Sequence, residues 1–289
     1  MKRIHAIVLS AGLALAAAQA IAAPAAVVEG VKMPAWVEHD GVRTPLAPGM
    51  ALIEGDQVQT GADSRLLVRL AEGSRVRLGA NATLLIANIE PNRGGFFRAA
   101  LNVLEGAFRF TTEALAKARR REVSITLRTV TAGIRGTDLW GRSTDAKQIV
   151  CLIEGKIEVE PDNEGAITMD QPLQFYQREH GKSLPVGRVS PEQLAKWAAE
   201  TEIAKGAGAA MRGGKWKLTL ATATTQGEAL DVYLRLRAAG YPARIYPAKA
   251  GGKRVYHVRI TQLPSRADAE ALAGRLRGDM GVAEPKVSM

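Results

Sequence analysis

The feature that most constrains this chain is the alternation of strand-like and helix-like patterns over residues 215–289. Apolar and polar residues alternate over 216–220 with the period of two that a half-buried strand requires. Apolar residues at three- and four-residue spacing predict helices over 225–240 and 265–276. Further short strands are predicted at 243–246, 256–260 and 282–287. This order of elements predicts a small α+β domain near the C-terminus.

Polar residues of the predicted strands are expected to share one face of this small sheet. The order β-α-β-β-α-β is that of a ferredoxin-like fold, in which helices cover one side of the sheet. Because side chains alternate between the two faces of a strand, Arg244, Tyr246, His257 and Arg259 should point the same way. A solvated sheet face and a ligand groove both fit this pattern.

The charge of the C-terminal region favours an anionic partner. From Gly213 onward, thirteen Lys and Arg stand against six Asp and Glu, so this region carries +7 of the whole chain's +10. Such a field draws in anionic polymers, although at about 0.15 M salt it is screened beyond about 8 Å. It therefore guides binding without specifying the ligand.

Three local sequences of this region resemble the SPOR (sporulation-related repeat) domain. They are Gly240-Tyr241-Pro242-Ala243, the strand 256–260, and Arg266-Ala267-Asp268-Ala269-Glu270. The resemblance covers nearly all of 215–289. It implies binding of peptidoglycan glycan strands stripped of their stem peptides. The candidate binding residues on this interpretation are Lys217, Thr219, Arg244, Tyr246, His257 and Arg259.

Residues 27–186 read as a long β-rich region with short turns. Gly and Asp or Asn recur at turns such as 55–56, 61–63 and 79–81. Regular short strands of this kind predict a sandwich, roll or barrel. The strands are expected at 66–70, 75–78, 83–86, 101–111, 123–130, 149–153 and 156–160, and a helix at 113–121.

This β region resembles the FecR-type periplasmic domain. The resemblance rests on Leu52-Ile53-Glu54-Gly55-Asp56, on Leu70-Ala71-Glu72-Gly73-Ser74, and most specifically on Arg135-Gly136-Thr137. We interpret Arg135 as a structural residue, since its donors can bind several carbonyl groups at a turn. The family's namesake receives a signal from an outer-membrane transporter, which implies an interaction or sensing role for this domain.

The N-terminus predicts export. Lys2 and Arg3 precede an apolar run over 6–18, and small residues follow it. This is typical of a cleavable signal peptide, with cleavage expected after Ala22 or alternatively after Ala20. No later apolar run reaches the ~20 residues that cross a bilayer, so no integral membrane segment is expected after cleavage.

The expected organisation is therefore a signal peptide (1–22), a FecR-like β domain (23–187), a helix and Gly/Ala linker (188–214) and a SPOR-like domain (215–289). The helix should begin at Ser190-Pro191-Glu192 and pack as a lid on the β domain, with Leu194 and Trp197 on one side. The small residues of 206–214 predict a flexible linker that lets the two domains move independently.

The residues offer little catalytic chemistry. Cys151 lies in an apolar run and is expected to be buried and unreactive, and His39, His180 and His257 are too far apart in sequence to predict a metal site. A carboxylate pair for glycoside cleavage could be drawn from Glu54, Asp56, Glu72 and Asp138.

The sequence thus favours a non-enzymatic periplasmic envelope protein that binds peptidoglycan, with no cofactor and no nucleic-acid partner. An envelope protein is a possible partner of the FecR-like domain, and the division septum is a possible location. Two alternatives stay open at this point: a ligand-sensing regulator and a cell-wall hydrolase.

Overall fold

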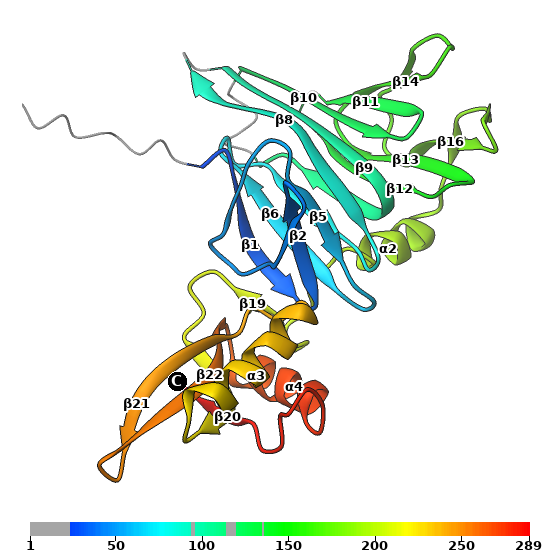
Figure 1. Cartoon of the computed structure of the whole chain (residues 1–289). Coiled ribbons are helices and arrows are strands. Elements are labelled where there is room, and N and C mark those ends of the chain that lie inside the picture. Colours follow the sequence, from blue (N-terminus) through cyan, green and yellow to red (C-terminus); the bar gives the residue numbers. More distant parts are fainter. Residues whose placement is uncertain (1–23, 94–95, 114–119, 135) are drawn as a thin grey trace, which may run out of the picture.

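The computed structural model describes residues 24–93, 96–113, 120–134 and 136–289 (Figure 1). The structure is mostly β, with 52% strand and 13% helix, and a small α+β region follows a large β region. The mostly-β fold class is confirmed at this level. The predicted signal peptide lies outside the described residues. In the described part of the chain, no helix combines the length and hydropathy that crossing a membrane requires.

The β region contains two sheets that share one long strand. The first sheet contains β1 (Ala26–Lys32), β4 (Ala51–Leu52), β6 (Arg65–Leu70), β7 (Arg75–Leu78), β12 (Asp138–Ser143), β13 (Lys147–Glu154), β16 (Gln174–Glu179), β17 (Lys182–Ser183), β18 (Gly187–Arg188) and β19 (Ala210–Met211). The second contains β2 (Ala35–His39), β3 (Val42–Pro45), β5 (Gln57–Thr60), β8 (Thr83–Arg93), β10 (Arg120–Leu127), β11 (Val130–Ile134), β14 (Ile157–Pro161) and β15 (Ile167–Met169). Buried side chains of both sheets, such as Val68 and Leu84, belong to one hydrophobic core.

The shared strand, β9 (Phe96–Thr111), passes from one sheet to the other at Gly106. Residues up to Glu105 pair with β8, and residues from Gly106 onward pair with β12. Gly106 has a φ of +88°, and a Cβ at this position would lie 2.6 Å from the Cα of Ala82. Both conditions favour glycine, so the bend between the sheets depends on this residue.

Two predictions for this region differ from the structure. The stretch 123–130, expected as one strand, is a hairpin, because β10 ends at Leu127 and β11 begins at Val130. Arg128 in the turn has a φ of +48°. Since Gly, Asn and Asp are the residues that mark such turns, an arginine gave no turn signal. The helix expected at 113–121 falls outside the described residues at 114–119, and its end belongs to β10.

Helix α2 (Pro191–Ala199) covers an apolar patch of the first sheet. It follows the N-cap Ser190, whose Oγ accepts a hydrogen bond from the backbone N–H of Gln193 at 3.2 Å. The indole of Trp197 stacks on that of Trp140 in β12, with ring centroids 4.7 Å apart and planes inclined by 8°. Leu194 packs on the same patch. The predicted helix and its packing on the β region are confirmed.

Cys151 lies in β13 beneath this helix. It is fully buried, and burial raises the pKa of its thiol to about 12. The predicted burial of this cysteine is therefore confirmed.

The C-terminal region is an antiparallel sheet with two helices. Its elements are β20 (Trp216–Ala223), α3 (Gln226–Ala238), β21 (Arg244–Ala250), β22 (Lys253–Leu263), α4 (Arg266–Leu276) and β23 (Lys286–Ser288), and the strand order is β21-β22-β20-β23. Thr225 and Glu228 form a capping box at the start of α3. Both helices contact β20 and β22 through buried apolar residues, namely Ala229, Val232, Leu236, Ala269, Leu272 and Leu276.

The segment between α2 and β20 is held by both regions of the chain. Met211 and Ala210 pair with Gly30 and Val31 of β1. The buried N–H of Gly208 donates to the Asp268 carboxylate in α4 at 3.1 Å. These contacts fix the segment, so the prediction of a flexible linker that lets the two regions move independently is wrong. Amino-acid composition suggests flexibility because it does not reveal backbone pairing or buried hydrogen bonds.

Further contacts join the two regions directly. The Arg275 guanidinium of α4 donates to the carbonyl oxygen of Met33 at 3.1 Å and to that of Gly208 at 2.9 Å. Gln262 of β22 donates to the carbonyl oxygen of Pro48 at 3.2 Å. The C-terminal sheet therefore has a fixed position at one end of the β region (Figure 1).

Candidate functional site

The candidate residues of the C-terminal sheet are brought together by its strand register. Arg244 of β21 lies opposite Arg259 of β22, and Tyr246 lies opposite His257. Thr219 of β20 lies opposite Arg259 on its other side. Cross-strand partners point to the same face of a sheet, so these five side chains form one face, as their alternation predicted. We call this surface the polar face.

Side-chain contacts order the centre of the polar face. The Arg259 Nε donates to the Thr219 Oγ1 at 3.0 Å, and the Arg259 guanidinium lies 5.8 Å from the centroid of the Tyr246 ring. Thr219 is only 8% exposed. It therefore positions Arg259 and offers little surface of its own to a ligand, which refines its predicted role.

His257 adds a titratable group to this face. Its Nδ1 lies 2.9 Å from the hydroxyl of Thr222 in β20. Partial burial lowers the pKa of the imidazole, and the neighbouring charge of Arg259 lowers it further. His257 is therefore mostly neutral near pH 7 and can accept as well as donate hydrogen bonds.

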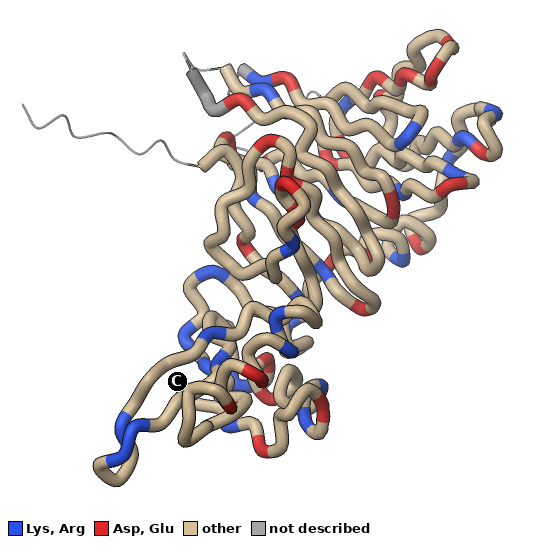
Figure 2. The backbone as a smooth tube through the Cα atoms, in the orientation of Figure 1, with Lys and Arg blue, Asp and Glu red and all other residues tan. Residues whose placement is uncertain are grey.

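The edges of the polar face are cationic. Arg244 and Lys217 are exposed, and Lys217 lies two residues from Thr219 on the same strand. Figure 2 shows Lys and Arg along the hairpin of β21 and β22, where Asp and Glu are absent. Among the described residues, no salt bridge includes Arg244 or Arg259, so their charges remain available to an anionic ligand.

Two residues of this face were missed by the sequence interpretation. Thr222 lies opposite His257, and Lys286 of β23 lies opposite Thr219. Both border a hollow of about 350 Å³ between β20 and the segment that leads into β23. A register shift between Thr219 and Ala221 turns Thr222 toward the polar face, which simple alternation from Thr219 does not predict. The lysine within the last predicted strand was a usable signal for Lys286.

The second predicted motif lies in the β region and is partly described. Arg135 lies outside the described residues. Gly136 has a φ of +73°, and Thr137 is 1% exposed, with its backbone N–H donating to the Thr112 Oγ1 at 3.3 Å. A Cβ on Gly155 would lie 2.7 Å from the carbonyl oxygen of Gly136. Gly136 and Thr137 are therefore packed into a tight corner, which fits a structural role.

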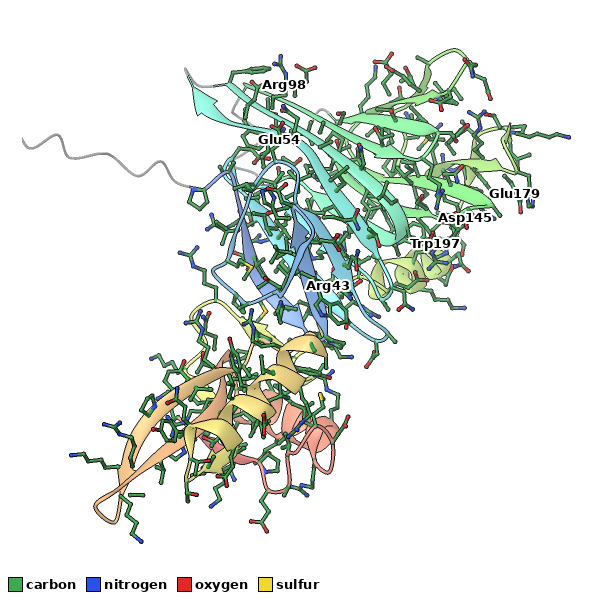
Figure 3. The ribbon with its side chains drawn as sticks, viewed as in Figure 1. Arg43, Glu54, Arg98, Asp145, Glu179 and Trp197 are labelled. Carbon is green, nitrogen blue, oxygen red and sulfur yellow. The ribbon has the colours of Figure 1, made fainter. Side chains whose placement is uncertain are left out.

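The carboxylates that a hydrolase would require lie in different settings. Glu54 is exposed on the loop after β4 (Figure 3). Asp56 lies 2.8 Å from the His39 Nδ1, and Asp138 accepts a bond from Arg109 at 2.7 Å. Glu72 is 3% exposed, and this burial raises the pKa of its carboxyl group. Asp56 and Asp138 therefore each lie against a basic side chain, whereas the Glu72 carboxyl group lies in the interior.

Comparisons with known families agree with this division of the chain. The family model described as FecR protein matches residues 56–158. The model described as SPOR domain matches residues 213–284. The chain therefore carries a FecR domain followed by a SPOR domain, as the local sequences predicted. SPOR domains bind peptidoglycan, both families are non-catalytic, and both are typical of periplasmic or envelope proteins.

The chain is also similar to solved structures, at low identity. Two crystal structures of an anti-sigma factor candidate from Parabacteroides distasonis ATCC 8503 match it. The first has a TM-score of 0.41 at 13% identity and covers 69% of this chain and 97% of that chain. The second has a TM-score of 0.40 at 12% identity and covers 68% and 96%. The comparison with curated proteins gives no match.

Proposed function

We propose that this protein is a non-enzymatic periplasmic protein that binds peptidoglycan glycan strands through the polar face of its SPOR domain. The FecR domain is thereby held at the cell wall, where it is available to a ligand or an envelope protein. The observation that carries the proposal is the Arg244–Arg259 cross-strand pair on a face that the helices leave open.

The charge of this pair supports an anionic ligand. Like charges directly opposite each other destabilise a sheet, so a bound anion would relieve a repulsion that the free protein carries. Hydrolysis of the amide that attaches a stem peptide leaves a carboxylate on the glycan, which makes a stripped strand anionic. The arginine forks suit carboxylates, and the Tyr246 ring and the Thr222 hydroxyl suit the faces and hydroxyl groups of sugars.

The proposal includes an organisation and a location. We assign the signal peptide to 1–22, the FecR-like domain to 23–187, the connecting helix and linker to 188–214 and the SPOR-like domain to 215–289. The strand order β21-β22-β20-β23 supports a ferredoxin-like topology for the last of these. The basic and apolar residues at the N-terminus support export to the periplasm, with the division septum as the proposed site of accumulation.

Pelleting of the purified full-length protein with cell-wall sacculi tests this function. Sacculi treated with an amidase, which removes stem peptides, should retain more protein than untreated sacculi. Charge reversal by Arg244→Glu with Arg259→Glu should weaken retention at least tenfold. The matched control reverses two exposed arginines at the two ends of α4, Arg266 and the C-cap residue Arg277, and should pellet like the wild type. Equal retention of both double variants would show that the polar face does not bind the glycan.

A ligand-sensing regulator is the second candidate. It is favoured by the junction, because Arg275 bonds the backbone that follows β1 and Asp268 bonds the backbone that enters β19. A change in either domain would then alter the contacts of the other. Failure to pellet with any sacculi, combined with capture of an envelope protein by the FecR domain, would favour this function over wall binding.

A further inference from the structure

The hairpin that joins β21 to β22 ends in a compact cationic tip. Lys249 lies opposite Arg254, and Ala250 lies opposite Lys253, with Gly251 and Gly252 in the turn. All three cationic side chains are exposed. The tip extends away from the rest of the molecule, and Figure 2 shows its positive residues at the end of the SPOR domain far from the β region.

The charges of this tip have no partner within the chain. Among the described residues, no salt bridge or side-chain hydrogen bond involves Lys249, Lys253 or Arg254. Between residues 244 and 259 there are five Lys or Arg and no Asp or Glu. Because Lys249 and Arg254 repel each other directly across the hairpin, these charges reduce the stability of the fold. A binding role explains their presence better than a structural one.

The chemistry of the tip differs from that of the polar face. Its other residues are Ala248, Ala250, Gly251 and Gly252, whose side chains provide no aromatic ring, amide or hydroxyl group for recognising a sugar. In the described part of the chain, none of the principal hollows is lined by its residues. A convex projection without a hollow is poorly suited to enclosing a small anion, but it can bring three cations against a flat anionic surface.

We propose that the tip formed by Lys249, Lys253 and Arg254 binds the phosphate headgroups of an anionic lipid bilayer. The attraction is electrostatic, because the tip has no large apolar side chain to insert among the lipid chains. This contact is separate from glycan binding, and it goes beyond the proposed function. It would let the SPOR domain contact a membrane surface while the polar face remains open to the wall.

Sedimentation of the full-length protein with lipid vesicles tests this proposal. Vesicles of phosphatidylglycerol and phosphatidylethanolamine should bind the protein, whereas vesicles of phosphatidylcholine should not. Each basic residue near an anionic membrane strengthens binding about fivefold, so Lys249→Gln, Lys253→Gln and Arg254→Gln together should weaken it on the order of 100-fold. Raising the salt concentration should weaken wild-type binding steeply.

The matched control neutralises three exposed cations elsewhere in the SPOR domain, by Lys215→Gln, Arg266→Gln and Arg277→Gln. This control should keep most of the vesicle binding, and the tip variant should keep its pelleting with sacculi and an equal or higher unfolding temperature. Inorganic phosphate at millimolar concentration should compete no better than sulfate at the same ionic strength.

Several results would overturn the proposal. Equal vesicle binding by the tip variant and the control would show that the tip is not the contact, and equal binding to phosphatidylcholine would show that charge is not the cause. Loss of sacculus pelleting in the tip variant, without loss of vesicle binding, would assign the tip to the glycan site. Selective competition by phosphate would replace the bilayer with a small anion.

Discussion

Removal of the Asp268 carboxylate should weaken the contact between the two domains. Asp268 is 3% exposed, and its Oδ1 accepts the bond from the buried N–H of Gly208 at 3.1 Å. Its Oδ2 accepts a bond from the Ser265 hydroxyl at 2.5 Å. A hydrogen bond to a charged group contributes about 1.5–3 kcal/mol, so losing both in Asp268→Ala should cost about 3 kcal/mol. Asp268→Asn keeps an acceptor for Gly208 and should cost about 1 kcal/mol.

Amide hydrogen exchange and chemical denaturation measure this effect. In Asp268→Ala the Gly208 amide should exchange about 100-fold faster, in line with the 3 kcal/mol loss, while amides of β6 and β7 in the FecR domain change little. The control is Glu270→Ala, which removes an exposed carboxylate from the same helix and its pair with Arg266; it should cost at most about 0.5 kcal/mol. If the Gly208 amide of the wild type exchanges as fast as an amide of an unfolded chain, Gly208 does not form the hydrogen bond to Asp268.

Other perturbations test the lid, the cysteine and the histidine. Trp197→Ala should expose the Trp140 ring and lower the free energy of unfolding by about 2 kcal/mol, because a partly buried indole is lost; a change below about 0.5 kcal/mol would contradict the stacking. Cys151, with its pKa raised to about 12, should resist a thiol reagent at pH 8 until the protein is unfolded, and labelling of the native protein would contradict this. His257 has a lowered pKa, so the unfolded chain binds its proton at a higher pH and stability falls as the pH drops below about 6.5. His257→Gln should lose less stability than the wild type between pH 7 and pH 5 in denaturation curves, and an equal loss would assign the pH dependence to other groups.

Local signals predicted the local elements of this fold well. The capping residues Ser190 and Thr225 lie where helices begin. In β6 and β7, buried residues alternate with half-buried ones, as the alternation of apolar and polar residues predicts. The same two-residue period predicts that Arg244, Tyr246, His257 and Arg259 share a face, and the strand register confirms it. These successes depend on side-chain spacing within short segments, which a sequence displays directly.

The features that the sequence interpretation missed depend on contacts between distant segments. Gly106 is one glycine among many, and its role in moving β9 between sheets follows from the close approach of Ala82. Thr222 reaches the polar face through a register shift that has no composition signal. Residues 206–214 read as flexible because small residues are common in linkers, although here small size allows close packing, as the buried Gly208 shows.

The pairing of β19 with β1 bears on how the FecR domain can be isolated and how it folds after export. One edge of β1 is covered by β4 at Ala26 and Val27, and by β19 at Gly30 and Val31. A fragment that stops before residue 210 would leave the backbone groups of Gly30 and Val31 on this edge unpaired. Unpaired groups on a strand edge can pair with strands of other chains and cause aggregation. During export that edge stays unpaired until nearly three quarters of the chain has crossed the membrane. We expect fragments extended to Met211 to remain monomeric at concentrations at which shorter ones aggregate.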